Sequence, residues 1–248
     1  MHPNQKNIKN RQTQEPLRSL HGIKKIQYIW DYYKLLLIII GIILYIFIYI
    51  LYRHFSYKDT ILYTALVNVN AGENLTEQLG KGFMEVMDLN TSSNKLQIYS
   101  GLYLTDDENN PYHEYTYASQ LKILASIDGE SLDVVLMDKE AFDAFSQNGY
   151  LCNLDELFTE EYAAFYEDIK TFVVDNIYIE EDNSFELIFD SSIPYSAVTE
   201  EYPMGLDMSQ AQLIKQAGFE ETVYLGIIAN SPRKDIAVAY LQYLFYGK

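Results

Sequence analysis

Amide, hydroxyl and carboxylate side chains follow several of the apolar segments that we expect to form strands. Such groups can hold a small molecule by hydrogen bonds, and in open α/β sheets ligands bind outside the carboxyl ends of parallel strands. By this rule the candidate ligand-binding residues are Asn68, Asn70, Tyr103, Thr105, Met137, Asp138, Ser191, Ser192 and Tyr195. The last three join the others only if a later strand returns alongside. For each residue the alternative is an ordinary place in a turn at a strand end.

The chain lacks the residue patterns of common hydrolases and metalloenzymes. It has no G-x-S-x-G or H-E-x-x-H motif and no Cys/His cluster, and its histidines after residue 50 are His54 and His113. The acid pairs 160–161 and 180–181 are adjacent in sequence, so their side chains splay apart on a helix or strand. We assign Glu200-Glu201 to the surface of a turn. We therefore expect no enzyme, no cofactor and no metal site.

The elements that must position the candidate residues alternate between strands and helices. Segments 61–70, 95–104 and 132–137 are rich in apolar and β-branched residues, as buried strands are. Helices are predicted between them, over about 74–89 and 112–126. The residues expected to face inward on these helices are Leu75, Leu79, Phe83 and Val86, then Tyr117, Leu121 and Leu124. Strands that alternate with helices indicate an α/β fold with parallel pairing.

The later part of the chain is predicted to be less regular. We expect a helix over 160–168 and a strand pair, 172–179 with 185–189, joined by an acidic turn. Near the end, Asn230 or Ser231 is expected to cap a final helix that has Pro232 in its first turn. The single cysteine, Cys152, cannot form an intramolecular disulfide and is expected to be a small buried residue.

Eighteen consecutive uncharged residues, Leu35–Tyr52, precede all of these elements. A helix of this length spans roughly 27 Å, close to the thickness of the hydrocarbon core of a bilayer, so we expect a membrane anchor. A buried core helix and a cleaved signal peptide are the alternatives. Residues 1–34 carry seven Lys or Arg and two acids, a net charge of +5. Because the whole chain has a net charge of −17, the remainder has a net charge of −22. The positive-inside rule then places the N-terminus in the cytoplasm and the C-terminal domain outside, at the cell membrane.

These observations divide the chain into three parts: a basic cytoplasmic tail with a juxtamembrane helix (1–34), a transmembrane helix (35–54) and an extracytoplasmic α/β domain (60–248). The lipid bilayer is the expected partner of the second part. The acidity of the third part argues against nucleic acid as a partner, because like charges repel.

Two blocks of the sequence resemble the extracellular solute-binding proteins of bacterial ABC importers. In block 124–157, Asp133-Val134-Val135 is similar to a strand of that family, and Asn148-Gly149-Tyr150-Leu151 is similar to the turn after the next helix. Block 224–245 resembles the family's late strand, its "NS" cap and its C-terminal helix. The resemblance implies a periplasmic-binding-protein-like parallel-sheet lobe. The family normally has a second lobe, which here must be reduced because only residues 160–203 can supply it.

The resemblance implies a single-pass, membrane-anchored, extracytoplasmic solute-binding-like protein. Such a protein binds a small-molecule ligand or assists an importer permease at the outer face of the membrane. The alternative is an interaction or structural membrane protein that keeps the fold but has a degenerate cleft and binds no ligand. The shortness of the region available for a second lobe favours this alternative.

Overall fold

The computed structural model describes residues 23–247, and the chain divides into two units, Met1–Tyr57 and Lys58–Lys248. The described part of the first unit is one continuous helix, α2 (Ile23–Ser56). Its segment Tyr33–Arg53 has a mean hydropathy of 3.0 and no part of it is buried. This helix is long and apolar enough to cross a membrane, and a signal sequence near an N-terminus has the same properties. The part of the predicted basic tail before residue 23 lies outside the described residues.

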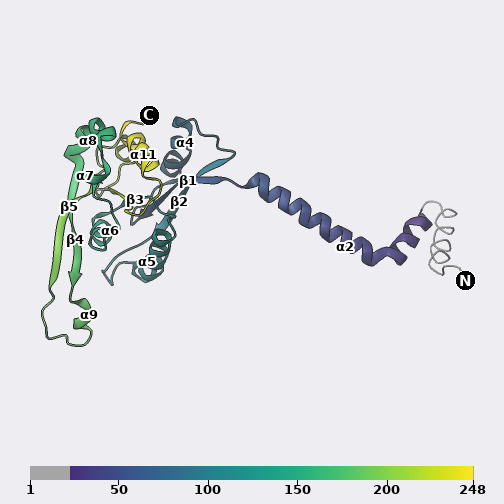
Figure 1. The fold of residues 1–248 in the computed structure, drawn as a ribbon, viewed down its shortest axis with the longest axis horizontal. Helices are drawn as coiled ribbons and strands as arrows, with labels where there is room; N and C mark the ends of the chain where they lie inside the picture. Colours follow the sequence, from purple (N-terminus) through teal and green to yellow (C-terminus); the bar gives the residue numbers. More distant parts are fainter. Residues whose placement is uncertain (1–22, 248) are drawn as a thin grey trace, which may run out of the picture. The chain divides into compact units, whose positions relative to one another are not determined.

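The second unit is built on a mixed sheet (Figure 1). The strands found in the described residues form one six-stranded sheet in the order β2-β1-β3-β6-β5-β4. The strands are β1 (Asp59–Val67), β2 (Asn94–Leu102), β3 (Val134–Met137), β4 (Val173–Asp182), β5 (Ala197–Asp207) and β6 (Tyr224–Ile227). β1 pairs in parallel with β2 and β3, as predicted, whereas the other three pairings are antiparallel. The α/β class is therefore confirmed, but the sheet as a whole is mixed rather than parallel.

Helices cover both faces of this sheet. They are α3 (Glu73–Glu77), η1 (Gln78–Gly82), α4 (Phe83–Val86), α5 (His113–Asp128), α6 (Lys139–Gln147), α7 (Leu154–Leu157), η2 (Glu160–Tyr162), α8 (Ala163–Ile169), η3 (Lys170–Phe172), α9 (Ser184–Leu187), α10 (Gln212–Ala217) and α11 (Lys234–Tyr246). Side chains alternate between the two faces of a strand, so β3 contributes Leu136 to one core cluster and Met137 to the other. Burial on both faces explains why β1 and β3 are almost continuously apolar in sequence.

The first core cluster packs the predicted helix after β1 against the C-terminal helix. Phe83 lies at right angles to Tyr240, with ring centroids 5.0 Å apart. The Tyr243 hydroxyl donates a hydrogen bond to the Gln78 carbonyl oxygen at 2.8 Å, in the π-helical turn η1. This approach requires Gly82, because a Cβ at that position would collide with the Tyr243 hydroxyl. Leu75, Leu79 and Phe83 are buried as expected, whereas Val86 is exposed.

The second core cluster lies under α5 and α6 and corrects the predicted face of α5. Ile123 and Ile127 are the apolar side chains of α5 that enter the core, together with the polar Ser119. The residues predicted to face inward, Tyr117, Leu121 and Leu124, are exposed instead. α5 carries apolar residues on two sides, so periodicity alone selected the wrong side.

The predicted strand pair after α8 is partly wrong. β4 forms as predicted, but residues 185–189 lie in and after the short helix α9, and β4 pairs instead with β5. Glu200 and Glu201 belong to β5 rather than to a turn. Pro203 is accommodated in this strand opposite Asp175, beside a break in register. The region expected to supply a second lobe thus forms the short helices η2, α8 and η3 and then most of a long hairpin of the same sheet.

The two blocks of the resemblance pack directly against each other. β3 pairs antiparallel with β6, which joins block 124–157 to block 224–245. The fully buried Asp133 accepts a hydrogen bond from Ser231 Oγ at 2.6 Å and pairs with Arg233 Nε at 2.8 Å. The final helix therefore begins later than expected, at Lys234, and neither Asn230 nor Ser231 is its N-cap. Cys152 is buried, as predicted.

Candidate functional site

A cavity of about 330 Å³ lies at the carboxyl ends of β1, β2 and β3. We call it the strand-end cavity. It is lined by Asn68, Asn70, Tyr103, Thr105, Asn110, Pro111, Tyr112, Asp138, Glu140 and Glu221. Five of the nine candidate residues from the sequence are in this lining. The parallel pairing of β1 with both neighbours brings them together, because it places the three strand ends at one edge of the sheet.

Asn68 connects the three strand ends. It has a left-handed backbone conformation, with φ of 58°, directly after β1. Its Nδ2 donates to the Leu104 carbonyl oxygen at 2.6 Å, and its Oδ1 accepts from the Leu104 amide at 2.9 Å. The same Nδ2 lies 3.0 Å from Asp138 Oδ2 after β3. This set of hydrogen bonds fixes the floor of the strand-end cavity.

Asp138 is the half-buried acid of the cavity. Its Oδ1 accepts a hydrogen bond from the Ala141 amide at 2.9 Å, so the residue caps the N-terminus of α6. Burial raises the pKa of its carboxyl, while the hydrogen bonds from Ala141 and Asn68 oppose that shift; the charges of Glu140 and Glu221 raise the pKa further. A positive charge beside Asp138 would stabilise its ionised form and so oppose the rise in its pKa.

An aromatic wall closes one side of the strand-end cavity. The rings of Tyr103 and Tyr112 stack with centroids 4.1 Å apart and an interplanar angle of 5°, and Tyr115 approaches Tyr103 at 6.3 Å. The Tyr103 amide is fixed by a hydrogen bond to Ser119 Oγ at 3.0 Å. Aromatic faces of this kind attract cations and the apolar faces of ligands.

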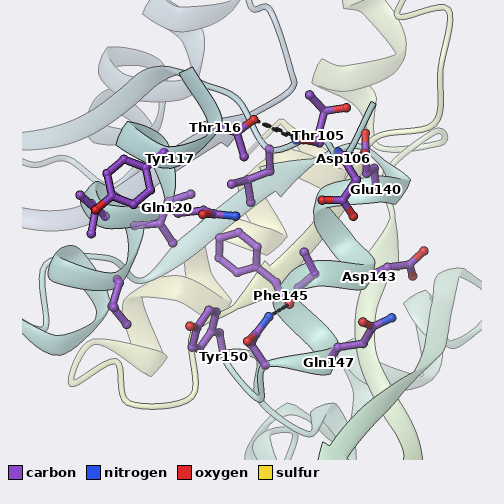
Figure 2. Close-up of a pocket in the computed structure, with 16 residues that line it drawn as sticks. Thr105, Asp106, Thr116, Tyr117, Gln120, Glu140, Asp143, Phe145, Gln147 and Tyr150 are labelled. Carbon is purple, nitrogen blue, oxygen red and sulfur yellow. Dashed lines mark hydrogen bonds between the residues drawn. The ribbon is translucent and has the colours of Figure 1, made fainter. Parts of the chain in front are cut away.

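A larger cavity, of about 550 Å³, lies between α5 and α6 (Figure 2). We call it the interhelix cavity. Tyr117 and Gln120 of α5 lie on one side of it and Glu140 of α6 on the other, whereas the Asp143 side chain points away from α5 (Figure 2) and accepts a hydrogen bond from Asn176 of β4. Leu121 and Leu124, the exposed apolar residues of α5, also line it. These two side chains are outside the core clusters and form part of the apolar wall of this cavity instead.

The two cavities adjoin. Thr105 and Glu140 line both of them. Glu140 is held in place by the Asp106 amide, which donates to its Oε1 at 2.7 Å. Buried Thr105 is tied to α5 through Thr116 Oγ1, which accepts from its amide at 3.3 Å. Thr105 and Glu140 therefore form the boundary between the two cavities.

The remaining candidate residues lie elsewhere. Met137 is fully buried in the second core cluster and lines neither cavity. Ser191, Ser192 and Tyr195 belong to the loop between β4 and β5, at the far end of the hairpin (Figure 1). There Ser192 Oγ donates to Asp190 and the Tyr195 hydroxyl donates to Asp182. β5 runs antiparallel to β4, which carries this loop away from the strand-end cavity.

The residues of α5 and α6 that line the interhelix cavity were not identified as site residues from the sequence. Two signals pointed to them. Glu140 and Asp143 closely follow Asp138, and α5 carries more apolar residues than one buried face requires. Among the described residues that line the two cavities there is no Lys or Arg, whereas Asp106, Asp138, Glu140, Asp143 and Glu221 are acidic. Asp143 is already paired with Lys139.

The lining of the two cavities combines acidic, amide and aromatic side chains. Within the described residues, no group of three His, Cys, Asp or Glu side chains is arranged to hold a metal ion. Carboxylates beside aromatic rings and amide groups attract amines and other cationic groups through charge, hydrogen bonds and cation–π contacts. Comparison of the chain with protein-family models, with curated proteins and with solved structures gives no match.

Proposed function

We propose that the protein is a single-pass, membrane-anchored, extracytoplasmic binding protein, similar to the solute-binding proteins of ABC importers, and that it binds a small cationic ligand. One observation carries the proposal: the ends of three strands converge on a polar cavity that adjoins a larger, partly apolar one. Open α/β sheets bind ligands at this edge. The described residues that line the two cavities include five acidic residues and no Lys or Arg, which favours a positively charged ligand.

The ligand is expected to have a charged group and an apolar body. The charged group fits beside Asp138 and Glu140, near the stacked Tyr103 and Tyr112 rings. The apolar body fits against Leu121 and Leu124 in the interhelix cavity. A volume of about 550 Å³ falls within the range of small-molecule sites, which is roughly 300 to 1,000 Å³.

The experiment is a thermal-shift titration of the full chain in detergent or nanodiscs. The probes are polyamines, quaternary ammonium compounds and basic amino acids, with dicarboxylates and neutral sugars as contrasting sets. A cationic probe at 100 times its Kd would stabilise the protein by about 2.7 kcal/mol. Glu140→Gln keeps a hydrogen-bond acceptor for the Asp106 amide but removes the charge shared by both cavities, so this shift should be lost. Glu200→Gln, in β5, is the matched control and should keep it. The proposal fails if no cationic probe shifts the transition, or if Glu140→Gln leaves the shift unchanged.

Anchoring and orientation are tested separately, because they stand on the helix α2 and on the basic residues before it. The mass of the protein isolated from its own cell membranes should correspond to the uncleaved chain. A membrane-impermeant maleimide should label Asn109→Cys in intact cells and should not label Gln14→Cys. The native Cys152 is buried and gives little background. Cleavage after α2, or labelling of the tail, would remove this part of the proposal.

Association with an importer permease is the proposed route by which a bound ligand would be used. It rests on the resemblance alone and is tested by isolating the full chain from native membranes with and without the cationic probe that binds. Enrichment of a transporter membrane subunit supports it, and its absence in both samples contradicts it.

A second candidate function is an interaction protein with no ligand. The β4–β5 hairpin favours it, because this part of the chain adds strands to the same sheet and forms no second lobe. A cleft closed by two lobes buries most of a ligand, whereas a single lobe leaves it open on one side. A specific ligand recovered with the purified chain would exclude this second candidate.

A further inference from the structure

The β4–β5 hairpin ends in an exposed apolar surface that the ligand-binding proposal does not use. We call this surface the apolar tip and define it as Phe185, Ile188, Phe189, Tyr195 and Val198. Their side chains are 70%, 76%, 76%, 56% and 54% exposed. The rings of Phe185 and Phe189 contact each other edge to face, with centroids 5.2 Å apart and an interplanar angle of 70°. Clustered apolar side chains on a loop mark an interaction site more often than isolated ones do.

The hairpin leaves the body of the domain before it reaches the tip. Only Leu206 and Asp207 of β5 pair with β6, so the rest of β5 pairs with β4 alone. β4 is held against α6 as far as Tyr178, whose ring packs over Gly149. Figure 1 shows the hairpin continuing past α6 to the loop that contains α9. The tip is therefore presented at a distance from the cavities.

The loop is closed by hydrogen bonds among its own residues. Asn183 Nδ2 donates to the Pro194 carbonyl oxygen at 2.9 Å, and Asn183 Oδ1 accepts from the Ser196 amide at 2.8 Å. Ser184 Oγ donates to Asp182 and Ser192 Oγ donates to Asp190, each at 2.6 Å. A loop fixed in this way loses little conformational entropy on binding, which favours its use as a preformed contact.

The charges around the tip restrict what can cover it. Residues 180–201 contain seven acidic residues, all exposed, and no Lys, Arg or His. Hydrogen bonds from the Ser184 and Ser192 side chains lower the pKa of Asp182 and Asp190, so both stay ionised near neutral pH. An anionic lipid surface would be repelled by this acidic border. A second copy of the tip would bring seven further negative charges against it.

We propose that the apolar tip is a docking site for a partner protein that presents an apolar pocket bordered by Lys and Arg. The aromatic and aliphatic side chains of the tip would fill the pocket, and the acidic border would pair with the basic rim. This division between a buried apolar centre and a charged rim is typical of protein interfaces. The inference is independent of ligand binding, because no tip residue lines either cavity.

The test uses the full chain expressed in its own cells, with the photo-cross-linking residue p-benzoylphenylalanine at position 189. The expected result is one major adduct with a protein whose cross-linked peptide is apolar and lies beside Lys or Arg. The same substitution at Gln216, an exposed residue of α10, is the matched control and should not give this adduct. Adding Ile188→Asp should reduce the yield of the adduct about tenfold, the change that corresponds to 1.4 kcal/mol. Raising the salt concentration should also reduce it.

Each other outcome overturns the proposal. These outcomes are an adduct with lipid, an adduct with a second copy of this chain, an adduct with a region that lacks basic residues, and no adduct. An unchanged melting temperature for Ile188→Asp would show that the surface substitution has not unfolded the domain. The same variant should keep any thermal shift caused by a cationic probe, so failure of the tip proposal can be distinguished from failure of the ligand proposal.

Discussion

Asp133 and Arg233, which are 100 residues apart in the sequence, form an ion pair with 2.8 Å between Nε and Oδ2. The carboxylate is fully buried, and the guanidinium lies 4.8 Å from the centre of the Tyr63 ring. The Tyr63 amide also donates to Asp133 Oδ2, at 2.7 Å. One carboxylate therefore joins β1, β3 and the start of α11.

Replacing Asp133 with Ala should strongly destabilise the domain. The change leaves the Tyr63 amide and Ser231 Oγ without this acceptor and leaves Arg233 unpaired. Breaking a buried ion pair in this way costs about 3 to 5 kcal/mol of unfolding free energy. Urea denaturation measures it, and Ser231→Ala, which removes one hydrogen bond, should cost about 1 to 3 kcal/mol. Equal losses for the two variants would contradict the central role of Asp133.

Replacements of Asn68 should separate backbone strain from hydrogen bonding. Both Asn68→Gly and Asn68→Ala remove the hydrogen bonds to Leu104 and Asp138. Alanine must also adopt the left-handed conformation with φ of 58°, which disfavours it by roughly 1 kcal/mol relative to glycine. The unfolding free energy should be highest for the unsubstituted protein, lower for Asn68→Gly and lowest for Asn68→Ala. If Asn68→Ala is at least as stable as Asn68→Gly, the left-handed backbone conformation at this position imposes no strain.

The pKa of Asp138 should make stability depend on pH. Burial raises this pKa above the ordinary value of 3.8, so the native state holds the proton more tightly than the unfolded state. Tighter binding of this proton stabilises the folded state fully below pH 3.8, and the stabilisation is lost as the pH rises through the raised pKa of the folded state. The native protein should therefore lose stability relative to Asp138→Asn over that interval. Denaturation of both proteins across the acidic to neutral range measures the difference, and a constant difference would contradict the shift.

Gly205 should not tolerate a side chain. A Cβ there would lie 2.5 Å from Phe142 Cε2 and 3.3 Å from the Leu225 carbonyl oxygen. Overpacking of this kind costs about 1 to 3 kcal/mol, so Gly205→Ala should lower the melting temperature. Gly80→Ala is the contrasting variant, since its Cβ would meet only Ile98 Cδ1, at 3.6 Å. It lies in a helical turn and should be neutral or stabilising by up to about 1 kcal/mol. Similar melting temperatures for both variants would show that the Gly205 contact yields easily.

The first three strands and their parallel pairing could be predicted because their apolar segments are long and separated by helical patterns. The same pairing brought Asn68, Asn70, Tyr103, Thr105 and Asp138 to one cavity. Met137 was misplaced because the side chain of the last strand residue points into the core rather than out of the strand end.

Other parts could not be predicted because the competing patterns are equally strong locally. Phe185–Phe189 is as apolar as a strand, but it lies in a loop. Asn183 closes this loop by hydrogen bonds to Pro194 and Ser196, just before β5. β5 contains two glutamates and a proline, which are unfavourable for a strand, and it forms because β4 lies beside it. α5 buries Ile123 and Ile127 and packs on β2, while the similarly apolar Leu121 and Leu124 stay exposed, and no local pattern distinguishes the two pairs.

The order of strands in the sheet has a consequence for the time at which the domain can fold. β6 lies between β3 and β5, so it alone connects the β2-β1-β3 half to the β5-β4 half within the described sheet. Until Tyr224–Ile227 have been synthesised, β3 and β5 each have an unpaired edge, and such edges are prone to pair with other chains. The two halves of the sheet can therefore be joined only after β6 has been synthesised, and protection of the earlier strands until that point should decide how much correctly folded protein a cell obtains.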